Sequence, residues 1–105
     1  MPHVVLNGNV SIDEIFNKLR GVLICNESRI LKTDNIFMSH DKTSIIIESL
    51  TIEAGFKRIF FTMIGRRDDG VVIRIYQGSE VEKTVGVKSL LSEIAKQLLA
   101  AFGVV

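Results

Sequence analysis

The feature that most constrains this chain is a run of short β-prone segments, broken by tight-turn signals, between residues 22 and 77. The clearest segments are rich in isoleucine, valine, threonine and aromatic residues, and they cover residues 44–53, 57–64 and 71–77. Ala54-Gly55 separates the first two, and Arg66-Arg67-Asp68-Asp69-Gly70 separates the second from the third. Connections this short predict antiparallel hairpins, because parallel neighbours need a long crossover.

Two amphipathic segments flank this run. The capping box Ser11-Ile12-Asp13-Glu14 predicts a short helix at about residues 11–20. Apolar residues at helical spacing predict a second, amphipathic helix over residues 87–102. Further β-prone segments, of which the last two are parts of one bent strand, cover residues 3–7, 22–25, 29–33 and 36–39. We therefore expect an α+β fold, in which a mainly antiparallel meander sheet of four to six strands carries both helices on one face.

The length and composition bound this fold. The chain has 105 residues, which is enough for one domain with one core, so we assign residues 1–105 to a single α+β domain. Its mean hydropathy of +0.31 is high for a small soluble domain. We expect the apolar surplus to lie in a subunit interface or a ligand cavity. The isoleucine-rich, tryptophan-free composition is also compatible with a thermophilic source.

The register of the last hairpin predicts which side chains share a face. If residues 66–70 close symmetrically, the face under the helices is wholly apolar and carries Ile59, Phe61, Met63, Val71, Ile73 and Ile75. The other face then carries Phe60, Ile64, Val72 and Tyr76. Because both helices are needed on the first face, we expect these four residues to form a homodimer interface.

A row of polar side chains is predicted on that second face. Thr62 and Arg74 are expected to be neighbours across the hairpin. Glu48 joins them if the turn at Ala54-Gly55 has three loop residues, whereas with two it faces Phe61 under the helices. A cross-strand ion pair, or an ion pair exchanged across a dimer interface, is the favoured interpretation, and an anion or substrate site built on Arg74 is the alternative.

Basic residues are concentrated on the same two strands and their turn, at Lys57, Arg58, Arg66, Arg67 and Arg74. This group makes an anion-binding or nucleic-acid-binding patch an alternative function. The net charge of only +1 argues against a dedicated nucleic-acid binder, and Asp68 and Asp69 cancel charge at the tip of the hairpin.

No grouping of residues indicates catalysis, a cofactor or a metal site. His3 and His40 are far apart and have no cysteine or carboxylate at metal-ligand spacing. Cys25 ends an apolar run, which predicts a buried, inert thiol. With a single cysteine, no secretory signal and no apolar run of about 20 residues, the sequence predicts a cytoplasmic protein without a membrane partner.

The opening part of the chain resembles the roadblock/longin class of small dimerising domains. The resemblance rests on the helix at 11–20 followed by the segment Gly21-Val22-Leu23-Ile24-Cys25-Asn26-Glu27-Ser28-Arg29-Ile30-Leu31-Lys32-Thr33. It implies a scaffold or GTPase-associated role and no catalytic residues. The sequence departs from that class at residues 44–53, because the class has a long central helix there and Ile45-Ile46-Ile47 favours a strand. No family is assigned on this basis.

The favoured function is a non-catalytic, homodimeric interaction or scaffold protein, with a further protein partner as a second expectation. Two alternatives stay open. One is an anion or nucleic-acid binder that uses the basic hairpin 57–74. The other is a small-molecule-binding pocket between the C-terminal helix and the sheet, which would turn the apolar surplus inward.

Overall fold

In the computed structural model of the chain, the described residues are 3–7, 11–26, 29–67, 70–76 and 84–102. The elements follow the predicted order: β1 (His3–Asn7), α1 (Ile12–Lys18), β2 (Leu23–Asn26), β3 (Arg29–Met38), β4 (Ser44–Glu53), β5 (Phe56–Arg67), β6 (Gly70–Ile75) and α2 (Val85–Phe102). The α+β prediction is confirmed, and the expected bent strand is β3, which has a register shift between Thr33 and Ile36.

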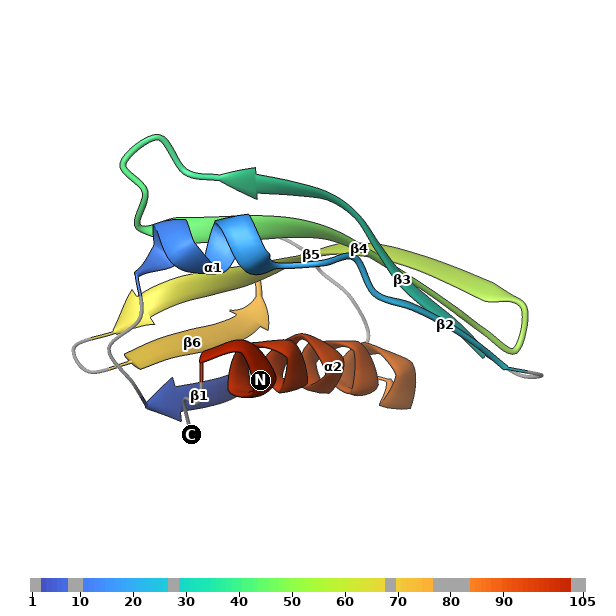
Figure 1. Cartoon of the computed structure of the whole chain (residues 1–105). Coiled ribbons are helices and arrows are strands. Elements are labelled where there is room, and N and C mark those ends of the chain that lie inside the picture. Colours follow the sequence, from blue (N-terminus) through green and yellow to red (C-terminus); the bar gives the residue numbers. More distant parts are fainter. Residues whose placement is uncertain (1–2, 8–10, 27–28, 68–69, 77–83, 103–105) are drawn as a thin grey trace.

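All six strands form one sheet in the order β1-β6-β5-β4-β3-β2. Every neighbouring pair is antiparallel, so β2 to β6 make a meander and β1 is added beside β6. Both helices lie on one face of this curled sheet (Figure 1). The far ends of the β2–β3 and β4–β5 hairpins extend beyond the N-terminal end of α2 (Figure 1).

The helices begin where the sequence supplies side chains to cap them. The Ser11 Oγ accepts a hydrogen bond from the Glu14 backbone N–H at 3.1 Å, as the capping box predicts. At the start of α2, the Thr84 Oγ1 accepts from the Val87 N–H at 3.3 Å. The Gln97 side-chain amide of α2 bonds the backbone N–H and carbonyl of Arg20, just after α1, at 3.0 and 2.9 Å. These bonds fix the two helices relative to one another.

A single hydrophobic core fills the space between the helices and the sheet. The helices and the residue after α1 contribute Ile12, Ile15, Leu19, Val87, Leu90, Leu91, Ile94, Ala95 and Leu98. The strands contribute Leu31, Ile45, Ile47, Phe60, Ile64, Val71, Ile73 and Ile75. Burial of one large apolar side chain contributes about 1.5–3 kcal/mol, so this layer is the main source of the stability of the domain.

The β4–β5 turn has two loop residues, Ala54 and Gly55, which both have positive φ, at 51° and 81°. Glu53 therefore pairs with Phe56 across the turn. Two consecutive residues with positive φ are typical of a hairpin turn whose twist matches that of the strands.

The last hairpin is shifted by one residue from the symmetrical closure that the sequence suggested. Arg66 pairs with Val71 and Arg67 with Gly70, and Asp68-Asp69 lies outside the described residues. A shift of one residue moves every side chain of one strand to the opposite face. The predicted face of β6 is therefore right, and the predicted face of β5 is wrong.

Candidate interaction surface

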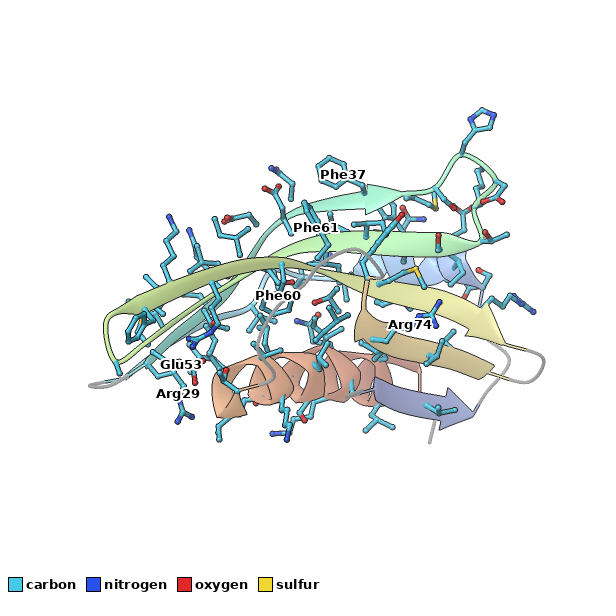
Figure 2. All side chains as sticks on the ribbon, turned by 180° about the vertical axis from the view of Figure 1, so that it is seen from behind. Arg29, Phe37, Glu53, Phe60, Phe61 and Arg74 are labelled. Atoms are coloured by element: carbon cyan, nitrogen blue, oxygen red, sulfur yellow. The ribbon has the colours of Figure 1, made fainter. Side chains whose placement is uncertain are left out.

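The helix-free face of the sheet is the candidate functional surface. It carries large apolar side chains that are exposed to solvent, from four strands and from the residue that follows β6: Val5, Leu23, Phe37, Ile59, Phe61 and Tyr76. Figure 2 shows Phe37 and Phe61 on the side of the sheet away from the helices, and Phe60 on the side that faces α2. Exposed apolar side chains that are spread over one continuous face are characteristic of interaction sites.

Two of the four residues that were predicted to form the dimer interface do not lie on the helix-free face. Phe60 and Ile64 are fully buried in the core, so their assignment to an interface is wrong. The cause is the shifted hairpin register, which puts Phe61 and Met63 on the helix-free face instead. Val72 and Tyr76 keep the predicted face, with Val72 half-buried and Tyr76 exposed.

The predicted polar row is divided between the two faces. Thr62 is buried under the helices, where its Oγ1 lies 2.8 Å from the Ser49 Oγ. Arg74 pairs with Met63 on the helix-free face, so Thr62 and Arg74 are not neighbours on one face. The two-residue turn places Glu48 opposite Phe61, as expected for that turn length, but both residues lie on the helix-free face.

Glu48 and Arg74 are thus the two members of that row that remain on one face. The Glu48 Oε1 accepts a hydrogen bond from the Asn35 Nδ2 at 2.9 Å. The Arg74 Nε is buried and has no hydrogen-bond partner among the described residues. Both side chains are half-buried, so each charge is partly desolvated by the apolar residues around it.

The predicted basic residues do not form one patch. Lys57 and Arg58 lie near the start of β5, and Arg66 lies near its end. At about 3.4 Å per residue, Lys57 and Arg66 are separated by about 30 Å. The Arg67 side chain lies outside the part of the chain that is described. Lys57 and Arg66 are therefore too far apart to bind one small anion together.

A cluster centred on Glu53 was missed in the sequence. The Glu53 carboxylate accepts hydrogen bonds from the Thr84 Oγ1 and from the Gly86 N–H, the latter at 2.9 Å, at the start of α2. Arg29 and Arg58 each place a guanidinium nitrogen 3.8 Å from it. Figure 2 shows Arg29 and Glu53 beside the first turn of α2. This carboxylate satisfies a helix N–H group that would otherwise lack a partner, so the cluster holds the β4–β5 hairpin to the helix.

One signal for that cluster was present in the sequence. Gly86 lies in the first turn of α2, where glycine has a poor helix propensity. A Cβ at this position would be 2.5 Å from the Glu53 Cδ, so only glycine permits this approach. A glycine in the first turn of a strong amphipathic helix therefore indicates a close neighbour.

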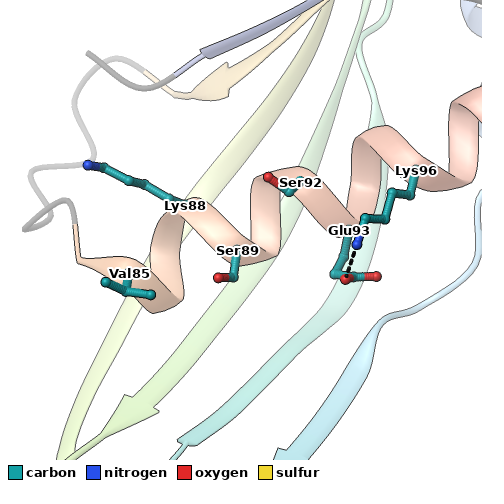
Figure 3. Close-up of a pocket in the computed structure, with 6 residues that line it drawn as sticks. All are labelled: Val85, Lys88, Ser89, Ser92, Glu93 and Lys96. Atoms are coloured by element: carbon teal, nitrogen blue, oxygen red, sulfur yellow. Dashed lines mark hydrogen bonds and ion pairs between the residues drawn. The ribbon is translucent and has the colours of Figure 1, made fainter.

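A shallow hollow of about 250 Å³ lies along α2. Figure 3 shows that α2 supplies its described lining residues, which are Val85, Lys88, Ser89, Ser92, Glu93 and Lys96. Lys96 and Glu93 form an ion pair at 3.2 Å within it. The apolar residues of α2 that face the sheet, such as Leu90 and Ile94, are packed into the core. The hollow is therefore on the polar side of the helix.

Cys25 is exposed on the edge strand β2, so the prediction of a buried thiol is wrong. Hydrogen bonds from Ser39 and Thr43 lower the pKa of Asp41, which is in an exposed turn. In the described part of the chain, no three His, Cys, Asp or Glu side chains are grouped as metal ligands would be. Neither of the described helices is long and apolar enough to span a bilayer.

Comparison with known proteins gives one distant likeness. A tRNA (guanine-N(7)-)-methyltransferase of Thermotoga maritima is 26% identical to this chain over 100 residues. The match covers 95% of this chain and 31% of that enzyme, so the chain spans about a third of the length of this relative. No family model matches the chain, and no solved structure matches it. At this identity and coverage, no family is assigned.

Proposed function

We propose that this chain is a non-catalytic interaction domain that forms a homodimer through the helix-free face of its sheet. One observation carries the proposal: both helices cover the same face, and the opposite face exposes large apolar side chains along much of its width. Exposed apolar area costs free energy in water, and a second copy of the same face would bury it. Closed two-fold dimers are the commonest assemblies of small soluble proteins.

The face is large enough for such a dimer. The two longest extents of the molecule are 39 and 27 Å. Six strands about 4.8 Å apart, with the longest about 40 Å in length, account for a rectangle of this size. A stable interface buries about 800 Å² on each partner. The helix-free face therefore has the necessary area without any contribution from the helices.

The experiment compares two double variants by size-exclusion chromatography with light scattering. Phe37→Asp/Ile59→Asp puts charges on the helix-free face, at side chains that are 51% and 60% exposed. Val85→Asp/Leu99→Asp is the control on α2, where the side chains are 62% and 38% exposed. Because all four sites are exposed in one copy, both variants are expected to keep the fold, as circular dichroism would check.

The expected result is that the sheet variant becomes monomeric while the helix variant keeps the wild-type mass. Loss of the dimer in the helix variant alone would assign the interface to α2 and contradict the proposal. A sheet variant that is folded and still dimeric would also contradict it.

A second candidate is an RNA-binding accessory module, which the likeness to a tRNA methyltransferase favours. The matched segment is about a third of that enzyme, and this chain has an all-antiparallel sheet in its described strands rather than a nucleotide-binding parallel one. Lys57 and Arg66 are about 30 Å apart along β5 and project from opposite faces of the sheet, so only a polyanion long enough to pass from one face to the other would contact both.

This second candidate predicts binding of transfer RNA that weakens steeply with salt. Fluorescence anisotropy with labelled tRNA at several salt concentrations would measure it. Lys57→Glu/Arg66→Glu should reduce the affinity and the salt slope, whereas Lys88→Glu/Lys96→Glu on α2 should leave both unchanged. Binding that is absent at low salt would remove this candidate.

A further inference from the structure

Two opposite charges on the helix-free face lie on either side of β5. Glu48 of β4 is opposite Phe61, and Arg74 of β6 is opposite Met63. Two strand spacings across the sheet and two residues along β5 put their Cα atoms about 12 Å apart. No ion pair joins Glu48 and Arg74 within the described part of the chain, and the midpoint between them is on β5, between Phe61 and Met63.

The guanidinium group of Arg74 has a donor without a hydrogen-bond partner among the described residues. This donor is the Nε, which is buried. Because the chain itself covers this Nε, a carboxylate from a partner would bind the terminal nitrogens of the guanidinium group, where bidentate pairs with carboxylates form. Glu48 has the complementary capacity, because a carboxylate accepts about four hydrogen bonds and the described side chains supply one, from Asn35.

A two-fold symmetric dimer would give the Arg74 guanidinium a carboxylate partner and the Glu48 carboxylate further donors. If the axis lies midway between the two facing sheets and parallel to them, crosses over β5 between Phe61 and Met63, and is perpendicular to the line from Glu48 to Arg74, it places Glu48 of one copy over Arg74 of the other, and the reverse. Sheets that pack face to face are about 10 Å apart, a distance that an arginine and a glutamate can bridge. The ring of Phe61 then lies at the centre of the interface, where a few residues usually carry most of the binding energy.

We propose that the homodimer is held in register by two equivalent ion pairs, each between Glu48 of one copy and Arg74 of the other. This inference rests on the proposed function. The occupant is a second copy because the face carries one acidic and one basic side chain, and a two-fold rotation that exchanges their positions sets each charge over its opposite. A polyanion on the same face would instead meet the Glu48 carboxylate, which would repel it.

Charge reversal and mixing test this pairing. Glu48→Arg alone and Arg74→Glu alone each replace both ion pairs by contacts between like charges, so each should weaken the homodimer by about tenfold or more. An equimolar mixture of the two variants restores both pairs, because one pair joins the two substituted side chains and the other joins the native Glu48 and Arg74. Native mass spectrometry with one variant isotope-labelled should therefore show mainly the mixed dimer.

Two further variants keep the test sharp. Glu48→Arg/Arg74→Glu carries both reversals and should regain a homodimer of nearly wild-type affinity. Glu48→Gln/Arg74→Gln removes both charges and keeps polar side chains, so it should dimerise more weakly and show no preference for mixed partners. Circular dichroism spectra would check that every variant is folded.

The outcomes separate this inference from the proposed function. If Phe37→Asp/Ile59→Asp dissociates the dimer but a mixture of Glu48→Arg and Arg74→Glu forms no mixed dimer, the ion pairing is wrong and the proposed interface is retained. If wild type and both reversed variants dimerise equally, the pairing is likewise overturned. A wild-type chain that is monomeric at all concentrations assigns the face to another occupant, RNA or a different protein, and overturns both proposals.

Discussion

The two faces of this sheet are built from the same residue types but differ in what covers them. On one face, Phe60 and Ile64 are sealed under the helices. On the other, Ile59 and Phe61, the chain neighbours of Phe60, remain exposed. The hydrophobicity of a strand therefore does not tell which of its sides is the core. The two helices cover one apolar side of β5, and the other side is the surface that we propose for association.

The faces also use their charges differently. Glu53 belongs to the helix-covered side, where it is bonded to Thr84 and Gly86 and flanked by two arginines. Glu48, on the open side of the same strand, accepts a hydrogen bond from Asn35 and has no ion pair with another described residue. The first carboxylate holds the β4–β5 hairpin to α2, and the second is the one that we propose to pair with Arg74 of a second copy. Four predictions test this contrast.

The largest difference in stability is expected between substitutions of two adjacent phenylalanines, Phe60 and Phe61. Phe60→Ala should lower the free energy of unfolding by about 3–5 kcal/mol, because it removes a fully buried ring from the core. Phe61→Ala should cost about 1 kcal/mol or less at concentrations where the chain is monomeric, because its ring is on the exposed face. Urea unfolding followed by circular dichroism would measure both. Equal losses would contradict the register of β5.

The next largest difference in stability is expected between substitutions of two glutamates of β4, Glu53 and Glu48. Glu53→Gln should destabilise one copy by about 1–2 kcal/mol, because it weakens the cap on α2 and removes the charge between Arg29 and Arg58. Glu48→Gln should change the stability of one copy by less than about 0.5 kcal/mol. Chemical unfolding at low protein concentration gives both values. A larger effect at Glu48 would reverse the roles assigned to the two carboxylates.

Gly86 sharpens the account of the helix-covered side. Alanine is normally better than glycine in a helix by about 1 kcal/mol. Here Gly86→Ala should instead destabilise the fold by about 1 kcal/mol, because the new Cβ would push the Glu53 carboxylate away from its hydrogen bonds with Thr84 and Gly86. In a Glu53→Ala background the same change should become stabilising. A double-mutant cycle measures this coupling, and additive effects would show that the two residues are not in contact.

The smallest effect concerns the turn that aligns β4 with β5. Ala54 has a φ of 51°, a conformation that costs free energy for a residue with a Cβ and that asparagine adopts more readily. Ala54→Asn should therefore raise the free energy of unfolding by about 0.5–1 kcal/mol, as thermal unfolding would show. A destabilised variant would indicate a different turn, and hence a different register between β4 and β5.

Local signals predicted most of the fold. The Ser11 capping box and the helical spacing over residues 87–102 located both helices, and the turn at Ala54-Gly55 located the hairpin between β4 and β5. These features depend on neighbours in the sequence, so they can be read there. The α+β class followed because short connections between β-prone segments force antiparallel pairing.

The face of β5 could not be predicted in the same way. Its alternate residues are apolar on both sides, so the hydrophobic pattern does not decide between a symmetrical and a shifted hairpin. The decision lies in tertiary contacts: Thr62 is accepted in the core because the Ser49 hydroxyl is within hydrogen-bond distance. The Glu53 cluster was missed for a similar reason, since Glu53 and Gly86 are far apart in the sequence.

The solution mass of the wild-type chain, measured by light scattering over a range of concentrations, shows whether the chain forms a dimer. A homodimer through the helix-free face should give a species of twice the 11.7 kDa chain mass, which dissociates to single chains on dilution. A mass of one chain at every concentration would contradict it, because the helix-free face would then have no second copy to cover it.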